Sequence, residues 1–321
     1  MTTEMTSPSS GEVLHLVLAN SARNFLLNDV GTIGNLVDPA DQTGVNQAPA
    51  TGANGAVLVF GTPRRRANET DRVHQSRVAM RRIRSNLRTF RLAVDPGWST
   101  ALRAELSWYS RCLGESRDLH VLRDMLTIHG PLLLAEVELK PIVDIVDQSI
   151  SGAGARVAVA RAGDRHARLV DQMRLLRDAP QFTDKAERPA IELMPSLLHR
   201  AWLDVRGAGR TARKDPSIQH LHKLRIRLKG LRYGCETVAV VAGDPAERTA
   251  RAAEKLQGKL GDLLDATHSV EWLQAVADSH PELARSTESL MVVQRAAAIV
   301  TRRGWKNDLK DIERRWRKWQ A

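Results

Sequence analysis

The sequence predicts an all-α fold, and three observations support this prediction. Apolar residues recur at three- and four-residue steps through most of the 321-residue chain, which is the spacing of one face of a helix. Only 4% of the residues are aromatic, whereas sheet proteins draw heavily on aromatic and β-branched side chains. A motif of basic residues also occurs twice at a constant offset, which indicates two copies of one helical unit.

Helices are expected to follow one another, separated by breaks rich in Gly and Pro. The first covers residues 12–30, and the Gly-, Ala-, Asn- and Pro-rich segment at 31–70 predicts a long loop. Asp215-Pro216 has the pattern of an N-cap followed by Pro at the first helical position. We expect breaks between helices at 95–97, 130–131, 151–154, 178–180, 206–209, 243–245 and 280–281.

The final stretch predicts an amphipathic helix with a seam of tryptophans. Its apolar residues follow 4-3-4-3 steps: Trp305, Leu309, Ile312, Trp316 and Trp319. The opposite face is basic. A seam with this spacing is more typical of a helix packed on a core than of a membrane or nucleic-acid surface, so we expect it to be buried.

Composition bounds the class of protein. Hydrophobic residues make up 42% of the chain, which is enough for a sizeable core. No apolar run approaches 18 residues and the first residues lack the pattern of a signal peptide, so we expect neither a membrane span nor a membrane partner. Two cysteines, Cys112 and Cys235, cannot form a disulfide framework, which favours reduced core thiols and a cytoplasmic protein.

The charge balance points to a polyanionic partner. The formal net charge is +11, and 38 of the 48 basic residues are arginine. Arginine stays charged when partly buried and presents a planar fork of donors that suits phosphate groups. The alternative is a soluble protein whose composition is rich in arginine for unrelated reasons.

A basic motif that occurs twice is the strongest signal. With the spacing H-x2-R-x3-R-x2-R, it comprises His74, Arg77, Arg81 and Arg84, and then His222, Arg225, Lys229 and Arg232, at an offset of 148. A second match, at an offset of 147, joins Leu113-Gly114 and Asp118 to Leu260-Gly261 and Asp265. The chain is therefore interpreted as two copies of one helical unit, which meet near residues 178–190.

Helical geometry places each basic stripe beside the apolar stripe, and hence at a crevice between helices. Like charges at i,i+4 repel by about 0.2–0.5 kcal/mol per pair, and neither stripe contains an Asp or Glu. The counter-charge comes either from a bound anion, which we favour, or from carboxylates such as Asp118 and Asp265. A long repeating anion suits two such stripes, and the scarcity of stacking aromatics beyond Tyr233 favours one without bases.

The residues of the two repeated matches resemble a known family. VHQSRVAMRRIRSNLRTF at 73–90 and LHKLRIRLKGLRYGCETV at 221–238 are similar to the CHAD (conserved histidine α-helical domain) family. LGESRDLHVL at 113–122 and LQGKLGDLLDATHSV at 256–270 resemble its LG…D elements. The resemblance implies one domain over residues 10–321, preceded by a disordered tail at 1–9. Its fold would be a helical bundle of two pseudo-symmetric halves, about 10–180 and 181–321, around a central basic channel or groove.

The resemblance also implies a function, namely binding of inorganic polyphosphate and association with polyphosphate granules. The implied contacts are His74, Arg77, Arg81, Arg82, Arg84, His222, Arg225, Lys229 and Arg232. Basic positions on the same or adjoining helices add Arg88, Arg111, Lys255 and Lys259. Two positions depart from the family: Gly230 stands where the first copy has Arg82, and residues 263–265 read Leu-Leu-Asp instead of Leu-Asn-Asp.

We expect a binding protein with no catalytic residues, no metal and no cofactor, in which phosphate or sulfate ions could also occupy the site. The alternatives are a nucleic-acid-binding helical protein and an accessory to an enzyme that processes polyphosphate or triphosphate. His74 and His222 lie among like charges that disfavour their protonation, and a bound phosphate would reverse this effect. Polyanion binding is therefore predicted to strengthen below about pH 6.5.

Overall fold

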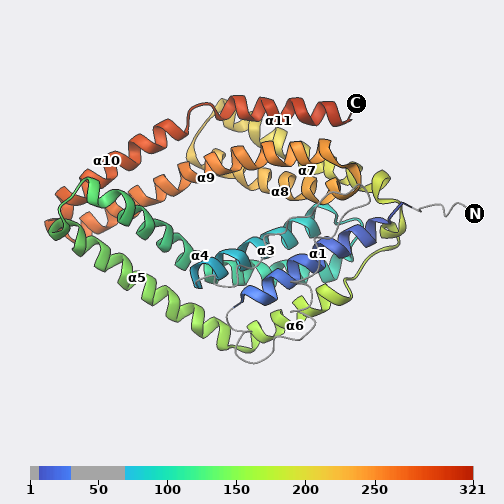
Figure 1. The fold of residues 1–321 in the computed structure, drawn as a ribbon, viewed down its shortest axis with the longest axis horizontal. Coiled ribbons are helices and arrows are strands. Elements are labelled where there is room, and N and C mark those ends of the chain that lie inside the picture. Colours follow the sequence, from blue (N-terminus) through green and yellow to red (C-terminus); the bar gives the residue numbers. More distant parts are fainter. Residues whose placement is uncertain (1–6, 30–68, 321) are drawn as a thin grey trace, which may run out of the picture.

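The computed structural model describes residues 7–29 and 69–320, and within them the all-α prediction is confirmed (Figure 1). These residues form no strand, only two isolated bridges, Ser9–Pro189 and Val94–Phe182. The predicted loop at 31–70 lies outside the described residues, except that its last two positions already belong to a helix. The long helices are α1 (Ser10–Asn28), α3 (Glu69–Thr89), α4 (Pro96–His129), α5 (Glu136–Ala162), α6 (Asp164–Asp178), α7 (Ala190–Lys214), α8 (Ile218–Ala242), α9 (Asp244–Ser279), α10 (Ala284–Thr301) and α11 (Trp305–Gln320).

Two long helical hairpins define the shape of the molecule. The pair α4 and α5 and the pair α9 and α10 run toward the left of Figure 1, where their far ends meet. At the opposite end, α1, α3 and α6 lie below α7, α8 and α11 in this view. Helix α3 packs directly against α8, so the two helices that carry the repeated basic motif are in contact.

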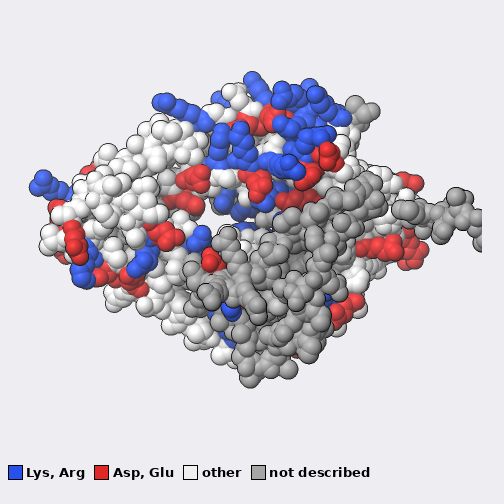
Figure 2. All heavy atoms as spheres, in the orientation of Figure 1, with Lys and Arg blue, Asp and Glu red and all other residues white. Residues whose placement is uncertain are grey.

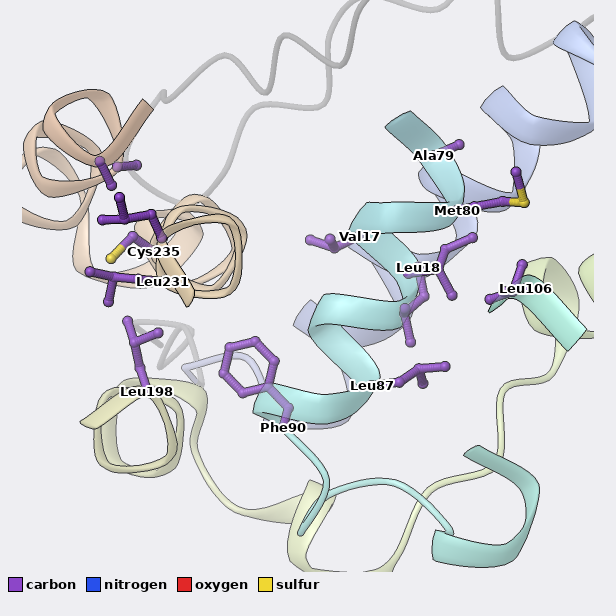
Figure 3. Close-up of a cluster of buried hydrophobic side chains, with 14 of the residues drawn as sticks. Val17, Leu18, Ala79, Met80, Leu87, Phe90, Leu106, Leu198, Leu231 and Cys235 are labelled. Atoms are coloured by element: carbon purple, nitrogen blue, oxygen red, sulfur yellow. The ribbon is translucent and has the colours of Figure 1, made fainter. Parts of the chain in front are cut away.

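The hydrophobic core is divided in the same way. A main cluster joins α1, α3 and α4 to α7 and α8, and Figure 3 shows Phe90 between the side chains of α3 and Leu198 of α7. Phe90, Leu198 and Leu231 of α8 are completely buried. A second cluster, which includes Leu126 and Leu273, fills the tip where the two hairpins meet. The main cluster fixes α3 against α8 through apolar burial, the dominant favourable term in folding.

Most of the predicted breaks are helix ends. Helix α4 begins at Pro96, directly after its N-cap Asp95, whose carboxylate accepts a hydrogen bond from the Trp98 amide at 2.7 Å. The breaks predicted at 151–154 and 206–209 are wrong, because these residues lie inside α5 and α7. A Cβ at Gly209 would lie 2.6 Å from Leu309, so this glycine allows α11 to pack closely on α7 instead of ending a helix.

Two terminus assignments also need correction. The N-cap of α8 is Ser217, whereas Asp215 is the C-cap of α7, and its carboxylate accepts a hydrogen bond from the Ser217 amide at 3.1 Å. The predicted tail at 1–9 is too long, because Ser9 and Glu12 form a capping box at the start of α1. Residues 1–6 lie outside the described residues.

The tryptophan seam of α11 is buried, as predicted, except for Trp319 near its end, which is half-buried. Trp305 and Trp316 are 3% and 2% exposed, and Trp316 stacks on Trp202 of α7 with ring centroids 5.3 Å apart. The opposite face of α11 carries exposed lysines and arginines, which Figure 2 shows as a blue region along the top of the molecule. Neither cysteine forms a disulfide; Cys235 is buried and Cys112 half-buried. Within the described ranges, no helix is long and apolar enough to cross a membrane.

A buried polar network ties α1 to three other helices. The completely buried Asp29 carboxylate accepts hydrogen bonds from Tyr109 Oη of α4 at 2.8 Å and pairs with His166 Nε2 of α6 at 2.5 Å. Arg161 of α5 lies 3.3 Å from the same carboxylate and donates to Tyr109 Oη at 2.9 Å. Burial is the main cause that raises the pKa of Tyr109, and the adjacent charge of Asp29 raises this pKa further.

We predict that Asp29→Ala destabilises the fold by about 3–5 kcal/mol, because it leaves buried cationic and polar groups without their shared carboxylate. The free energy of unfolding from urea titration would measure this. The control is Asp171→Ala, which removes an exposed carboxylate paired with Arg174 on α6 and should cost less than about 1 kcal/mol. Equal losses in the two variants would contradict the prediction.

Candidate anion-binding site

Four cations of the repeated motif gather where α3 packs on α8. Arg77 and Arg81 come from α3, and Arg225 and Lys229 come from the equivalent positions of α8. Their charges act on one another, since Arg225, Arg81 and Arg77 all lower the pKa of Lys229. We call these four residues the central basic cluster. Figure 2 shows Lys and Arg side chains within the hollow at the centre of this face of the molecule.

Arg77 is anchored to the backbone of α4. Its Nη1 donates to the carbonyl oxygens of Leu113 and Gly114, at 3.4 and 3.2 Å, and lies 3.7 Å from Asp118 Oδ1. These are the Leu-Gly and Asp residues of the second repeated match. Burial is the main cause that lowers the pKa of this guanidinium, while Asp118 opposes the shift.

Arg225 is held in a similar way against α9. Its Nε donates to the carbonyl oxygen of Gln257 at 3.4 Å, and its guanidinium lies over Gly261, where a Cβ would approach Nη2 to 2.9 Å. Asp265 partly offsets the lowering of the Arg225 pKa that burial causes. The glycine and aspartate of the second repeated match therefore help to position the first arginine of each motif.

Arg81 and Lys229 are different, because no carboxylate in the described part of the chain forms an ion pair with either of them. Arg81 Nε is buried without a hydrogen-bond partner there. Lys229 is half-buried, and burial together with the three neighbouring arginines lowers its pKa from 10.5 to about 7. This part of the cluster carries positive charge that the described residues do not neutralise.

Asp118 and Asp265 lie near each other at the edge of the central basic cluster. Burial raises the pKa of Asp265, the charge of Arg225 opposes the shift and the charge of Asp118 adds to it. Both carboxylates line a cavity of about 1060 Å³ between α4, α5 and α9, together with Arg77, Arg111 and His268. Internal carboxylates thus offset part of the charge of the central cluster, as the alternative interpretation of the sequence required.

The two motif histidines flank the cluster. Burial is the largest cause that lowers the pKa of each, followed by Arg117, Arg81 and Arg77 for His74 and by Lys229 and Arg225 for His222. His74 is half-buried and His222 exposed. The expectation that neighbouring cations disfavour their protonation is confirmed in direction.

Two predicted ligand residues are instead neutralised within the protein. Arg82 pairs with Glu236 at 2.9 Å, and Arg232 pairs with Glu236 and Glu254, each at 2.7 Å. Both guanidinium groups lie over the ring of Tyr233, 5.3 and 5.4 Å from its centroid. This arrangement was not predicted from the sequence, although Glu236 follows Arg232 by four residues, a spacing typical of helical ion pairs.

The remaining predicted residues are not part of the central basic cluster. Arg84 lies close to Arg103 and Arg111 of α4, whose charges add to burial in lowering the Arg84 pKa. Arg88 lies 3.8 Å from Asp204 of α7. Lys255 and Lys259 turn toward α11, where they pair with Asp308 at 3.3 and 2.5 Å.

Comparisons with known proteins agree with this architecture. The family model described as "CHAD domain" matches residues 60–274. An uncharacterized protein of Mycobacterium tuberculosis is 30% identical over 225 residues, which cover 66% of this chain and 42% of that protein. The chain thus spans less than half the length of this relative.

Two solved structures share the fold. One is described as PptA from Streptomyces chartreusis, with a TM-score of 0.67, 18% identity and coverage of 95% of this chain and all of the other. The other is the CHAD domain from the plant Ricinus communis, with a TM-score of 0.64, 19% identity and coverage of 97% and 92%. Since the family model matches well over half of the chain, this protein belongs to the CHAD domain family.

Proposed function

We propose that this protein binds inorganic polyphosphate without processing it, and that the phosphate chain lies over the central basic cluster. The observation that carries the proposal is the half-buried pair Arg81 and Lys229, which has no ion-pair partner among the described residues. Charge held in this way is costly unless a partner neutralises it. A bound polyanion would supply that partner.

We also propose that the two halves are related by a pseudo-two-fold axis, so that the two motifs line one basic channel or groove. Reciprocal contacts between α3 and α8 support this. Arg82 lies against Tyr233, and the equivalent pair, Ser85 and Gly230, is also adjacent, since a Cβ at Gly230 would lie 3.9 Å from Ser85 Oγ. An axis of this kind would place Arg81 opposite its own counterpart, Lys229.

In the proposed complex each cation has a distinct task. Arg77 and Arg225, held by backbone carbonyls, present pre-oriented guanidinium groups, and Arg81 offers a planar fork that can contact two phosphate oxygens. Lys229 acts as a compact point charge. His74 and His222 become additional donors once they are protonated.

Two alternatives are distinguished by experiment. A nucleic-acid binder would hold duplex DNA as tightly as polyphosphate at equal salt, with a steep salt dependence and little effect of cluster substitutions. An enzyme of polyphosphate turnover would release phosphate and would depend on the carboxylates next to the cluster, Asp118 and Asp265. Association with polyphosphate granules in the cytoplasm would follow from chain binding, and a fluorescent fusion protein would test it.

The first prediction about polyphosphate binding concerns the unpaired cations. Arg81→Ala/Lys229→Ala should lower the affinity for long-chain polyphosphate by about 10- to 100-fold, because each substitution removes a charge-assisted contact. Isothermal titration with polyphosphate, tripolyphosphate and duplex DNA at fixed salt would measure it. Lys306→Ala/Lys310→Ala removes the same charge from the exposed face of α11 and should change the affinity less than about threefold. A similar loss in both variants would indicate a diffuse basic surface.

The second prediction concerns pH. Lys229 has a pKa of about 7 in the free protein, lowered by burial and by three arginines against the opposing charge of Asp265. A bound polyanion raises this pKa, so binding takes up a proton above pH 7. The affinity should therefore fall as the pH rises from 7 to 9, by up to about tenfold per unit. Lys229→Arg should keep the affinity at pH 6 and lose most of this decrease, because arginine does not titrate in this range.

The histidines should add a separate dependence at lower pH. Their lowered pKa values are raised by the ligand, so the affinity should increase as the pH falls from 7 toward 5.5. His74→Ala/His222→Ala should flatten only this part of the profile. An unchanged profile in both this variant and Lys229→Arg would refute the proton coupling.

The third prediction uses the two glycines beneath the anchored arginines. Gly261→Ala places a Cβ 2.9 Å from Arg225 Nη2 and should displace this side chain, which lowers polyphosphate affinity by about three- to tenfold. Gly114→Ala is the matched control, since its Cβ would lie 4.0 Å from Arg77 Nη2 and should be tolerated. Equal affinities of the two variants would count against Arg225 as a contact.

A further inference from the structure

A second cluster of arginines lies at the C-terminal end of α3, outside the central basic cluster. Three guanidinium groups from three helices share one carboxylate, that of Asp204 on α7. Arg227 of α8 lies 3.2 Å from it, and Arg88 of α3 and Arg200 of α7 each lie 3.8 Å away. Arg91, just after α3, lines the same small pocket. Among the described residues, no other carboxylate pairs with these four arginines, so the group carries three excess positive charges.

The pocket also holds polar groups that suit a phosphate. Ser85 and Thr89, one helical turn apart on α3, both carry a hydroxyl group and line the pocket beside the arginines. Gly230 of α8 forms part of the wall. The first copy of the motif has Arg82 at the position equivalent to Gly230, and the missing side chain leaves space beside Ser85. Hydroxyl donors next to several guanidinium groups form a set of ligands that binds phosphate oxygens.

A line of cations connects this pocket to the central basic cluster. Arg81, Arg84 and Arg88 follow one another on one face of α3, and Arg81 and Arg88 are about 10 Å apart along the helix axis. Arg103 of α4 lies beside this line. Burial is the main cause that lowers the pKa values of Arg84 and Arg88, and the charge of Arg103 lowers both values further. Neither Arg84 nor Arg103 forms an ion pair within the described ranges.

We propose that the arginines around Asp204 form a second phosphate-binding site, which holds phosphate groups of a polyphosphate chain that extends beyond the central basic cluster along α3. This inference rests on the proposed function and adds a dependence on chain length. A short oligophosphate occupies the central cluster alone, whereas a long chain reaches both sites. The second site therefore increases the affinity for long chains and not for short ones.

The test compares tripolyphosphate with long-chain polyphosphate by isothermal titration across a salt series. Arg200→Ala/Arg227→Ala should bind tripolyphosphate like the wild type but lose about tenfold or more in affinity for the long chain. Its slope of log affinity against log salt should fall by about 1.4, since two phosphate contacts are lost. Arg81→Ala/Lys229→Ala should lose affinity for both ligands. Lys306→Ala/Lys310→Ala serves as the charge-matched control and should retain both.

Two further measurements keep the outcomes distinct. Arg91→Ala, at an exposed side chain, should weaken long-chain binding alone, and circular dichroism would verify that every variant is folded. Inorganic phosphate, titrated by itself, distinguishes a chain from a free ion. If the wild type binds neither phosphate polymer, the proposed function fails. If the wild type binds both polymers and Arg200→Ala/Arg227→Ala binds the long chain as tightly as the wild type does, only the second site is overturned. If the arginines around Asp204 bind free phosphate but no phosphate chain, the second site is overturned as well.

Discussion

The packing of α3 against α8 is the constraint on which the rest of the structure depends. Apolar residues such as Met80 and Leu228 bury one face of each helix and fix both helices in the main core. The neighbouring faces carry the basic motif, so apolar burial forces like charges together. Repulsion cannot separate Arg81 from Lys229 without exposing the core. The protein therefore holds a region of unbalanced positive charge. The burial of apolar residues in the core offsets the unfavourable electrostatic energy of this region.

Six basic residues of α3 and α8 divide into three pairs according to what neutralises them. Arg77 and Arg225 are held by backbone carbonyls, with Asp118 and Asp265 close by. Arg82 and Arg232 both pair with Glu236 beside the Tyr233 ring, and the Arg82–Glu236 pair links α3 to α8. Arg81 and Lys229 remain without an ion-pair partner in the described part of the chain. The first two pairs give the site its geometry, and the third provides the charge available for an anion.

Periodicity predicted the helices and the buried Trp seam because one side of each helix must face a core. Glycine was a less reliable signal, since a glycine within a helix can end it or allow close packing, as Gly209 does beneath α11. The repeat located the motif cations, but it could not tell which of them are paired. That depends on residues from other helices, such as Glu254 beside Arg232. Of the arginines around Asp204, only Arg88 continues the basic face of α3; the others have no periodic signal, because they come from separate segments.

Departures from the internal repeat matter as much as the repeat itself. A polyphosphate chain has the same chemistry in both directions, so the ligand alone cannot favour one orientation along α3 and α8. The protein is not symmetric: Gly230 opens a pocket where the first copy places Arg82, and the arginines around Asp204 extend the basic track from the C-terminal end of α3. Burial and three arginines lower the pKa of Lys229 to about 7, whereas its counterpart in the first copy is an arginine, Arg81. In the proposed complex the protein, and not the ligand, therefore determines which end of the groove holds the longer part of the chain.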